Sequence, residues 1–227
     1  MHIDEIIKNR KTQKVLANKV WPVSSNQKPI DQTINELLEL AASAPYHRKS
    51  HKKYGKNNQL NSCLPWRCYT LDTENCRLLF NYIEKQNIKA GKVSNMLAAA
   101  DGLMLMTWLP EPLTTNVKKQ DKTSEPVPFE GNIKNMEHIA ASSAAIQNIL
   151  IGATARNLPN YWSSGGQLRN VTLRKFLGIP MKEILLGALF IFPEDSEQKG
   201  AIIKSGSLRH QGKELDSWVK RVDISLL

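Results

Sequence analysis

The spacing of apolar positions along the chain predicts several helices. Between Asp31 and Pro45 the apolar residues recur at helical intervals, with Asp31 as the expected N-cap and Pro45 as the end. The same period predicts a short helix in HIDEIIKNR, an amphipathic helix in TENCRLLFNYIEKQ, and a short helix in VTLRKFLG that stops at Gly178.

The most informative prediction is a long helix in NMEHIAASSAAIQNILIGATARNL, with Asn135 as its N-cap and Glu137 in its first turn. Residues Ala140 to Ala145 are all Ala or Ser, so another backbone can approach this part of the helix closely. The second half is apolar almost all round, which is typical of a buried helix.

Strands are predicted where apolar residues alternate or form short runs. PWRCYTL alternates, whereas DGLMLMTWL and EILLGALFIF contain short, nearly continuous apolar runs. YWSSGG is expected to be a turn, residues 110–132 a long loop of the kind that forms a lid, and the tail a helical turn with a possible last strand. Because regular βαβ units and linkers are lacking, we expect one α+β domain over residues 1–227.

Charge is the next feature, because the chain carries a formal net charge of +10 and a pI near 9.5. From Leu40 to Leu71 there is no Asp or Glu, but there are six Lys or Arg residues and two His. Such a stretch could bind nucleic acid, a metal ion or a small anion, or could be a solvated surface loop. No nucleic-acid motif is present and aromatic residues are sparse, which makes nucleic acid unlikely.

Metal binding is also disfavoured. The conceivable ligands are His47, His51, Cys63 and Cys68, spaced His-x3-His and Cys-x4-Cys on an irregular loop and the start of a strand, whereas structural zinc sites usually have tighter Cys pairs. The three cysteines are an odd number, and the N-terminus has no apolar signal core. The longest apolar run, Ile184 to Phe192, is too short to cross a bilayer. We therefore expect a cytoplasmic protein without a metal or a membrane.

The first candidate binding site is Arg10, Lys11 and Thr12. Their planar guanidinium, ammonium group and hydroxyl could together bind a phosphate group. No dinucleotide fingerprint, P-loop or nucleophile triad is found. No residue is therefore assigned a catalytic role, and if the protein is an enzyme, a bound cofactor is expected to carry the chemistry.

Several motifs, taken in order, resemble the FMN-dependent nitroreductase family. The first is Arg10-Lys11-Thr12 at the end of the opening helix, and the second is Ala44-Pro45-Tyr46-His47. Pro65-Trp66-Arg67 follows, then the long Ala/Ser-rich helix, Leu158 to Gly166, and the closing GIP and LGALFIFPE segments. The chain is most similar to the branch in which Ala-Pro-x-His precedes Pro-Trp-Arg.

This resemblance implies a three-layer α+β sandwich with a central, mostly antiparallel sheet flanked by helices. It also implies a homodimer with FMN at the interface, NAD(P)H as hydride donor, and a nitroaromatic or quinone as acceptor. By the same likeness eight residues would contact FMN: Arg10, Lys11, Thr12, Ser43, His47, Trp162, Ser163 and Ser164.

The chain departs from the family pattern at several places. Lys11 and Thr12 replace an Arg and a Ser, an insertion of basic character occupies about residues 48–63, and a C-terminal arm covers about residues 196–227. The insertion could attract an anionic substrate or be merely solvated. The alternative function is a flavin-binding protein, or a basic ligand- or nucleic-acid-binding protein, without turnover.

Overall fold

The computed structural model describes residues 2–23, 30–55, 60–113, 128–208, 214–222 and 224. Its helices are α1 Ile3–Asn9, α2 Ile30–Ala42, α3 Thr73–Lys85, α4 Lys92–Ala99, α5 Ile133–Ala155 and α6 Val171–Phe176. Its strands are β1 Gln13–Leu16, β2 Trp66–Leu71, β3 Gly102–Trp108, β4 Asn160–Ser163, β5 Ile184–Ile191 and β6 Ile202–Ser205. Short 3-10 turns lie at Lys52–Tyr54, Gly166–Arg169 and Leu215–Ser217.

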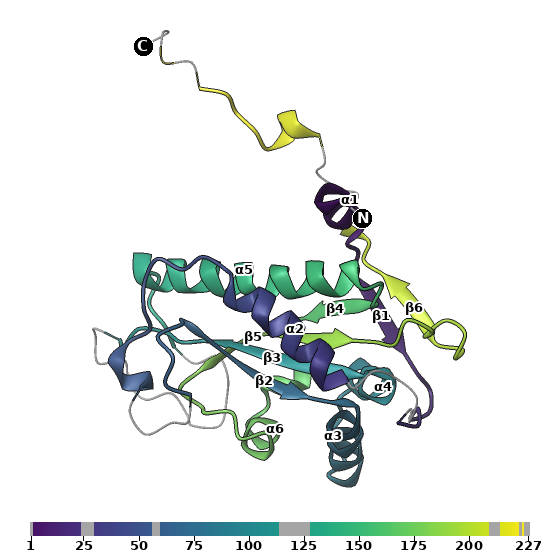
Figure 1. The fold of residues 1–227 in the computed structure, drawn as a ribbon. Coiled ribbons are helices and arrows are strands. Elements are labelled where there is room, and N and C mark those ends of the chain that lie inside the picture. Colours follow the sequence, from purple (N-terminus) through teal and green to yellow (C-terminus); the bar gives the residue numbers. More distant parts are fainter. Residues whose placement is uncertain are drawn as a thin grey trace.

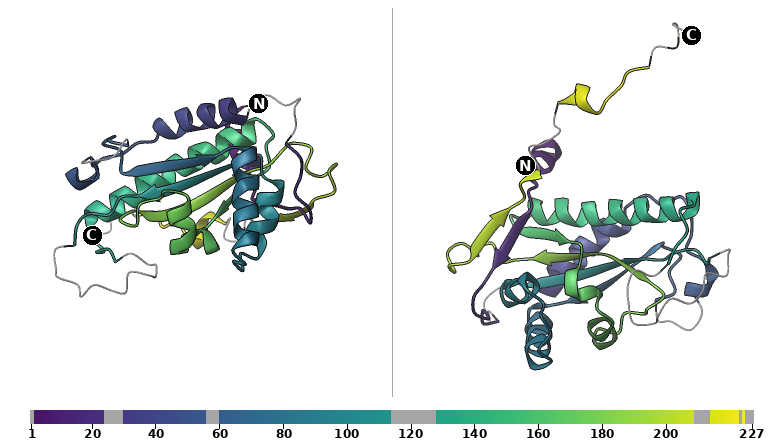
Figure 2. Two further views of the ribbon diagram at one scale, coloured as in Figure 1. Left: turned by 90° about the horizontal axis from the view of Figure 1, so that it is seen from below. Right: turned by 180° about the vertical axis from the view of Figure 1, so that it is seen from behind.

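A four-stranded antiparallel sheet forms the middle of three layers (Figure 1). Its strand order is β2-β3-β5-β4, with α2 and α5 on one face and α3, α4 and α6 on the other (Figure 2). Side chains alternate along β3, so Leu103 and Leu105 join the core under α3 and α4, while Met104 and Met106 join the core under α5. The α+β class and the antiparallel sheet flanked by helices are therefore confirmed.

Beside this sheet lies a separate ribbon made of β1 and β6, paired antiparallel from Gln13–Ser205 to Leu16–Ile202. Neither strand was predicted from the sequence, because each has only four residues and several of them are polar. Val15 and Leu16 are buried and attach the ribbon to the core under α3 and α4. The ribbon brings residues near 13 and near 204 together, although they are far apart in the sequence.

Several local predictions are corrected by the structure. Asn132 rather than Asn135 caps α5, since its side chain accepts a 3.0 Å hydrogen bond from the Asn135 backbone N–H. Asp31 lies inside the first turn of α2, not at its N-cap. Tyr161, Trp162 and Ser163 belong to β4, so YWSSGG is a strand end followed by a turn at Gly165 and Gly166.

Two predicted segments lie partly outside the described residues. Of the loop over residues 110–132, positions 114–127 are not described. In the C-terminal arm, Leu215–Ser217 forms the expected helical turn, and no strand occurs in residues 214–222. Trp218 and Val222 are 67% and 75% exposed there, so these apolar side chains are not buried in their own chain.

A buried arginine and a neighbouring aspartate join α3 to α4. Arg77 donates to the carbonyl oxygens of Leu97 and Ala100, at the end of α4, and to that of Trp21. Asp101 follows α4 directly, and burial raises the pKa of its carboxyl to about 6, although Lys199 and Arg77 oppose the shift. Because burial disfavours the carboxylate, Asp101 loses its proton at a higher pH in the folded protein than in the unfolded chain.

We predict that this carboxyl makes the free energy of unfolding depend on pH. Its folded-state pKa lies above the unfolded value of 3.8, so its stabilising contribution is complete below that value and is lost as the pH rises through about 6. Asp101→Asn should therefore gain up to about 2 kcal/mol relative to the unchanged protein between about pH 4 and pH 7. Urea unfolding at several pH values measures this difference, and a constant difference across the range would contradict the prediction.

Candidate functional site

Three of the polar side chains at the start of β1 line one pocket. Arg10 and Thr12 lie in the extended segment between α1 and β1, and with Lys14 of β1 they occupy every second position and line the same pocket. Tyr161 of β4 and residues 204–208 complete a pocket of about 580 Å³. The Lys14 Nζ lies 4.6 Å from the centre of the Tyr161 ring, a cation–π contact that holds the lysine at the pocket wall.

The far wall of this pocket was not found from the sequence. Lys204, Gly206 and Ser207 reach it because β6 pairs with β1. A Cβ atom at Gly206 would lie only 3.1 Å from the Cβ of Thr12, so a residue without a side chain suits this close approach. The only sequence signal for this wall was the short basic and small-residue stretch KSGS that follows two isoleucines.

Lys11 does not share this pocket. Alternation along the strand places Lys11 and Gln13 on the opposite face, where they line a different cavity. The structure thus brings Arg10 and Thr12 together and separates Lys11 from them. That separation does not test the predicted role of Lys11 toward FMN.

The predicted residues of the YWSSGG segment lie at the end of the edge strand β4. Trp162 is 36% exposed, and its indole lies against Gly187 of β5, where an added Cβ would come within 2.1 Å of the indole Nε1. Ser163 is buried, and its hydroxyl accepts a 3.2 Å hydrogen bond from the Gly165 N–H. Ser164 is exposed, and its carbonyl accepts a hydrogen bond from Arg169.

Ser43 and His47 lie in the segment that follows α2. The Ser43 hydroxyl donates to the carbonyl of Glu39, 3.2 Å away. His47 Nδ1 lies 3.2 Å from an oxygen of Glu137, whose other oxygen accepts from Arg48. The hydrogen bond with His47, followed by the contacts with Arg48, lowers the pKa of the Glu137 carboxyl. His47 is therefore held beside the start of α5.

The site residues near the ends of α5 consequently form two groups, one at His47 and one on the ribbon of β1 and β6, which lies beside the other end of the helix (Figure 1). His47 contacts Glu137 near the first turns of the helix. The ribbon that carries Arg10 and Thr12 lies beside the other end, where Lys11 shares a cavity with Thr154. Glu137 and Thr154 are separated by about 25 Å along the helix, at 1.5 Å per residue. One chain therefore does not bring both groups to one small ligand.

The basic insertion is anchored by two buried polar side chains. Tyr54 is 1% exposed, and its hydroxyl donates to the carbonyl of Pro110 at 2.7 Å and to that of Lys182 at 3.2 Å. Arg67 on β2 donates to four backbone carbonyls, those of Leu60, Ser62, Leu64 and Trp66. Both described ends of the insertion are thus attached to the sheet, while Arg48, Lys49 and Lys52 remain exposed.

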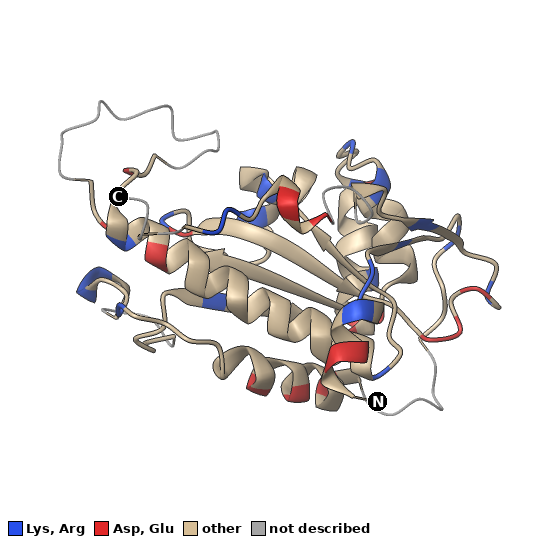
Figure 3. Ribbon diagram, turned by 90° about the horizontal axis from the view of Figure 1, so that it is seen from above, with Lys and Arg blue, Asp and Glu red and all other residues tan. Residues whose placement is uncertain are grey.

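The residues considered as metal ligands do not gather. His51 accepts a hydrogen bond from the Lys53 backbone N–H, Cys63 lies 3.4 Å from the Tyr46 hydroxyl, and burial raises the pKa of Cys68 to about 12. Among the described residues no group of three or more His, Cys, Asp or Glu side chains could hold a metal ion. Lys and Arg are spread over the described elements and interleaved with Asp and Glu (Figure 3).

Comparison with solved structures identifies the fold as that of the nitroreductases. A nitroreductase-like protein from Bacillus cereus superimposes with a TM-score of 0.62 at 20% identity, over 98% of this chain and 97% of that one. A nitroreductase with bound FMN from Bacteroides fragilis gives 0.53 at 15% identity, over 98% and 100%. A nitroreductase in complex with FMN from Desulfovibrio desulfuricans gives 0.53 at 17% identity, over 86% and 88%.

The sequence gives the same assignment. A model of the nitroreductase family matches residues 25–191, which is most of the chain, and the chain belongs to this family. No match was found among curated protein sequences. Within the part of the chain that the structure describes, no helix is long and apolar enough to span a membrane.

We predict that the anchoring of the insertion can be measured with two matched substitutions. Tyr54→Phe leaves the carbonyls of Pro110 and Lys182 without their donor and should lower the free energy of unfolding by about 1–2 kcal/mol. Tyr46→Phe, which removes the hydroxyl of an exposed tyrosine just before the insertion, should change it by less than about 0.5 kcal/mol. Denaturant unfolding gives both values, and equal effects would show that the Tyr54 hydroxyl is not an anchor.

Proposed function

We propose that the chain is an FMN-dependent oxidoreductase that uses NAD(P)H to reduce a small acceptor, such as a nitroaromatic or a quinone. Membership of the nitroreductase family supports this proposal, as do the two similar structures that contain FMN. The observation that carries it is the pocket in which Arg10, Thr12, Lys14 and Lys204 converge.

The side chains of this pocket fit the phosphate end of FMN. Arg10, Lys14 and Lys204 supply positive charge, and the hydroxyls of Thr12 and Ser207 supply neutral donors. A phosphate dianion favours such a mixture of cations and hydroxyl donors. We therefore assign the phosphate to these residues, with Lys14 and Lys204 in place of Lys11.

The end of β4 is proposed to contact the rest of the cofactor. Tyr161 already lines the phosphate pocket, and Trp162 is the next residue of the same strand. The half-exposed indole of Trp162, together with Ser163 and Ser164, is well placed to contact the isoalloxazine ring or the ribityl chain. The small residues Gly165 and Gly166, both with positive φ, let the chain turn away without crowding that surface.

The group at the other end of α5 is proposed to act on the FMN of a second copy. Because His47 lies beside Glu137, about 25 Å along α5 from Thr154, it would complete a flavin site only across a dimer interface, and we propose that Ser43, just after α2, acts with it. Apolar side chains on α1 and at the start of α5 are available to bury in that interface. They are exposed by 49–66%: Ile3, Ile7, Ile133 and Met136.

When bound, FMN supplies a ring that accepts a hydride and passes electrons on. The side chains of this protein then have the tasks of holding the cofactor, orienting it and limiting the access of water, and none needs to act as an acid or a base. Oxidation of NAD(P)H by the purified protein separates an enzyme from a flavin-binding protein without turnover. The preference for NADH or NADPH and the identity of the acceptor can be measured on the same preparation.

We predict that the protein binds FMN through Arg10. Removing one charged hydrogen bond should cost about 1.5–3 kcal/mol, so Arg10→Ala should raise the Kd for FMN by roughly 10- to 150-fold. Lys11→Ala, one position along the strand but on its other face, is the matched control and should change the Kd less than about twofold. Fluorescence titration of the apoprotein measures both. A colourless protein that takes up no FMN would contradict the proposed function.

A complementation experiment tests the shared site. We predict that Arg10→Ala and His47→Ala homodimers both bind FMN weakly, but that a co-expressed heterodimer of the two keeps one unaltered site. One site then carries both changes and the other carries neither, so about half of the normal FMN content should remain. Light scattering should give twice the chain mass of 25.6 kDa. A monomer at micromolar concentration, or a heterodimer without any unaltered site, would refute the arrangement.

A further inference from the structure

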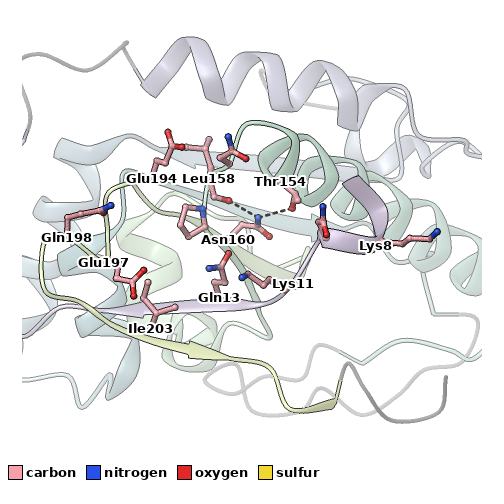
Figure 4. A pocket seen from close by; sticks show the side chains of 13 residues that line it. Lys8, Lys11, Gln13, Thr154, Leu158, Asn160, Glu194, Glu197, Gln198 and Ile203 are labelled. Atoms are coloured by element: carbon pink, nitrogen blue, oxygen red, sulfur yellow. Dashed lines mark hydrogen bonds between the residues drawn. The ribbon is translucent and has the colours of Figure 1, made fainter. Parts of the chain in front are cut away.

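A second polar cavity lies on the opposite face of β1 from the phosphate pocket (Figure 4). It has a volume of about 490 Å³ and is bounded by the end of α1, β1, the α5–β4 junction and the turn after β5. Lys11 and Gln13 line it, whereas Arg10, Thr12 and Lys14 line the other pocket. The proposed FMN site therefore does not use this cavity.

The floor of the cavity carries a buried hydrogen-bond acceptor without a partner. Asn160 is 2% exposed, and its amide nitrogen donates to Thr154 Oγ1 at 3.3 Å and to the Leu158 carbonyl at 2.9 Å. Since a carbonyl can only accept, the amide cannot be turned round, and its oxygen must point the other way. Within the described chain that Oδ1 atom has no hydrogen-bond partner. This oxygen is itself almost closed to solvent, so it marks a polar floor beneath the cavity rather than an open contact for a ligand.

The walls of the cavity carry opposite charges. Glu194 and Glu197 lie on one side, in the turn after β5, and Lys11 reaches toward Gln13 and Asn160 from the other (Figure 4). Lys8 also lines the cavity but points away from its centre (Figure 4). Among the described residues neither Lys11 nor Glu197 takes part in an ion pair, so both charges are available to a ligand.

We propose that this cavity binds a small zwitterion of the class of amino acids and short peptides. The ligand carboxylate faces Lys11, and its ammonium group faces Glu197 and Glu194. A simple anion would meet two carboxylates and a simple cation would meet Lys11, so neither matches both walls. Hydroxyl and amide groups of Thr154, Gln13 and Gln198 provide further polar contacts for a peptide backbone.

Isothermal titration of the purified full-length chain with three related peptides tests the proposal. Triglycine carries both charges, N-acetyl-triglycine lacks the ammonium group, and triglycine amide lacks the carboxylate. We expect triglycine to bind about tenfold more tightly than either blocked peptide. Lys11→Gln should abolish its advantage over the amide, and Glu197→Gln its advantage over the acetylated peptide. Lys175→Gln, at an exposed position on α6, should change neither.

The FMN content of each variant provides an independent reading. It should equal that of the unchanged protein, because Lys11 and Glu197 lie outside the phosphate pocket. Absence of saturable triglycine binding up to about 10 mM, equal binding of all three peptides, or preferences that survive both substitutions would each overturn the proposal. Loss of FMN in Lys11→Gln would also overturn it, because Lys11 would then serve the flavin site.

Discussion

Close contact between α5 and α2 is the constraint on which the other parts of the structure depend. A Cβ atom at Gly152 would come within 2.4 Å of Leu40 and 2.9 Å of Leu37, so these helices approach more closely than larger residues allow. Near the start of the same helix, the Asn135 side chain forms hydrogen bonds with the backbone of Glu111 and Glu130. One turn on, the Glu137 carboxylate contacts His47 and Arg48. Near the other end, the Thr154 hydroxyl accepts a hydrogen bond from the Asn160 amide. The position of one helix thus determines where the loop after α2, the long loop and the floor of the polar cavity lie.

The ribbon of β1 and β6 divides the neighbouring cations between two sites. In the extended segment that leads into β1, Arg10 and Thr12 line one pocket and Lys11 lines the other. The face with Arg10, Thr12 and Lys14 receives Lys204 from β6 and contains no carboxylate among the lining residues. The face with Lys11 meets Glu194 and Glu197. The first face is therefore suited to an anion, and the second to a ligand that carries both charges.

Secondary-structure elements could be predicted from the sequence where a long apolar pattern marks a buried strand or helix. They could not be predicted where only tertiary contacts make a short segment a strand. The strand β3 and the helix α3 have long apolar patterns and were found at nearly their observed bounds. The strands β1 and β6 have four residues each, and only their mutual pairing and the burial of Val15 and Leu16 make them strands. Arg10 and Thr12 could therefore be predicted as candidates, but their separation from Lys11 and the arrival of Lys204 depended on an unpredicted ribbon.

Buried polar residues such as Glu183, which accepts hydrogen bonds from Tyr69 and Thr107, had no signal in the sequence either.

The anchoring of the basic insertion changes how its charge should be interpreted. A solvated loop would spread its charge over many positions, whereas Tyr54 and Arg67 hold the described ends of this insertion against the sheet. Arg48 is further tied to Glu137 beside His47, at the end of α5 where the proposed dimer would present its second flavin. Positive charge held at a definite place acts on an approaching anion within about 10 Å at ordinary ionic strength. The described part of the insertion therefore lies on the His47 side of α5, away from the pocket of Arg10, Thr12 and Lys14 that is proposed for the FMN phosphate.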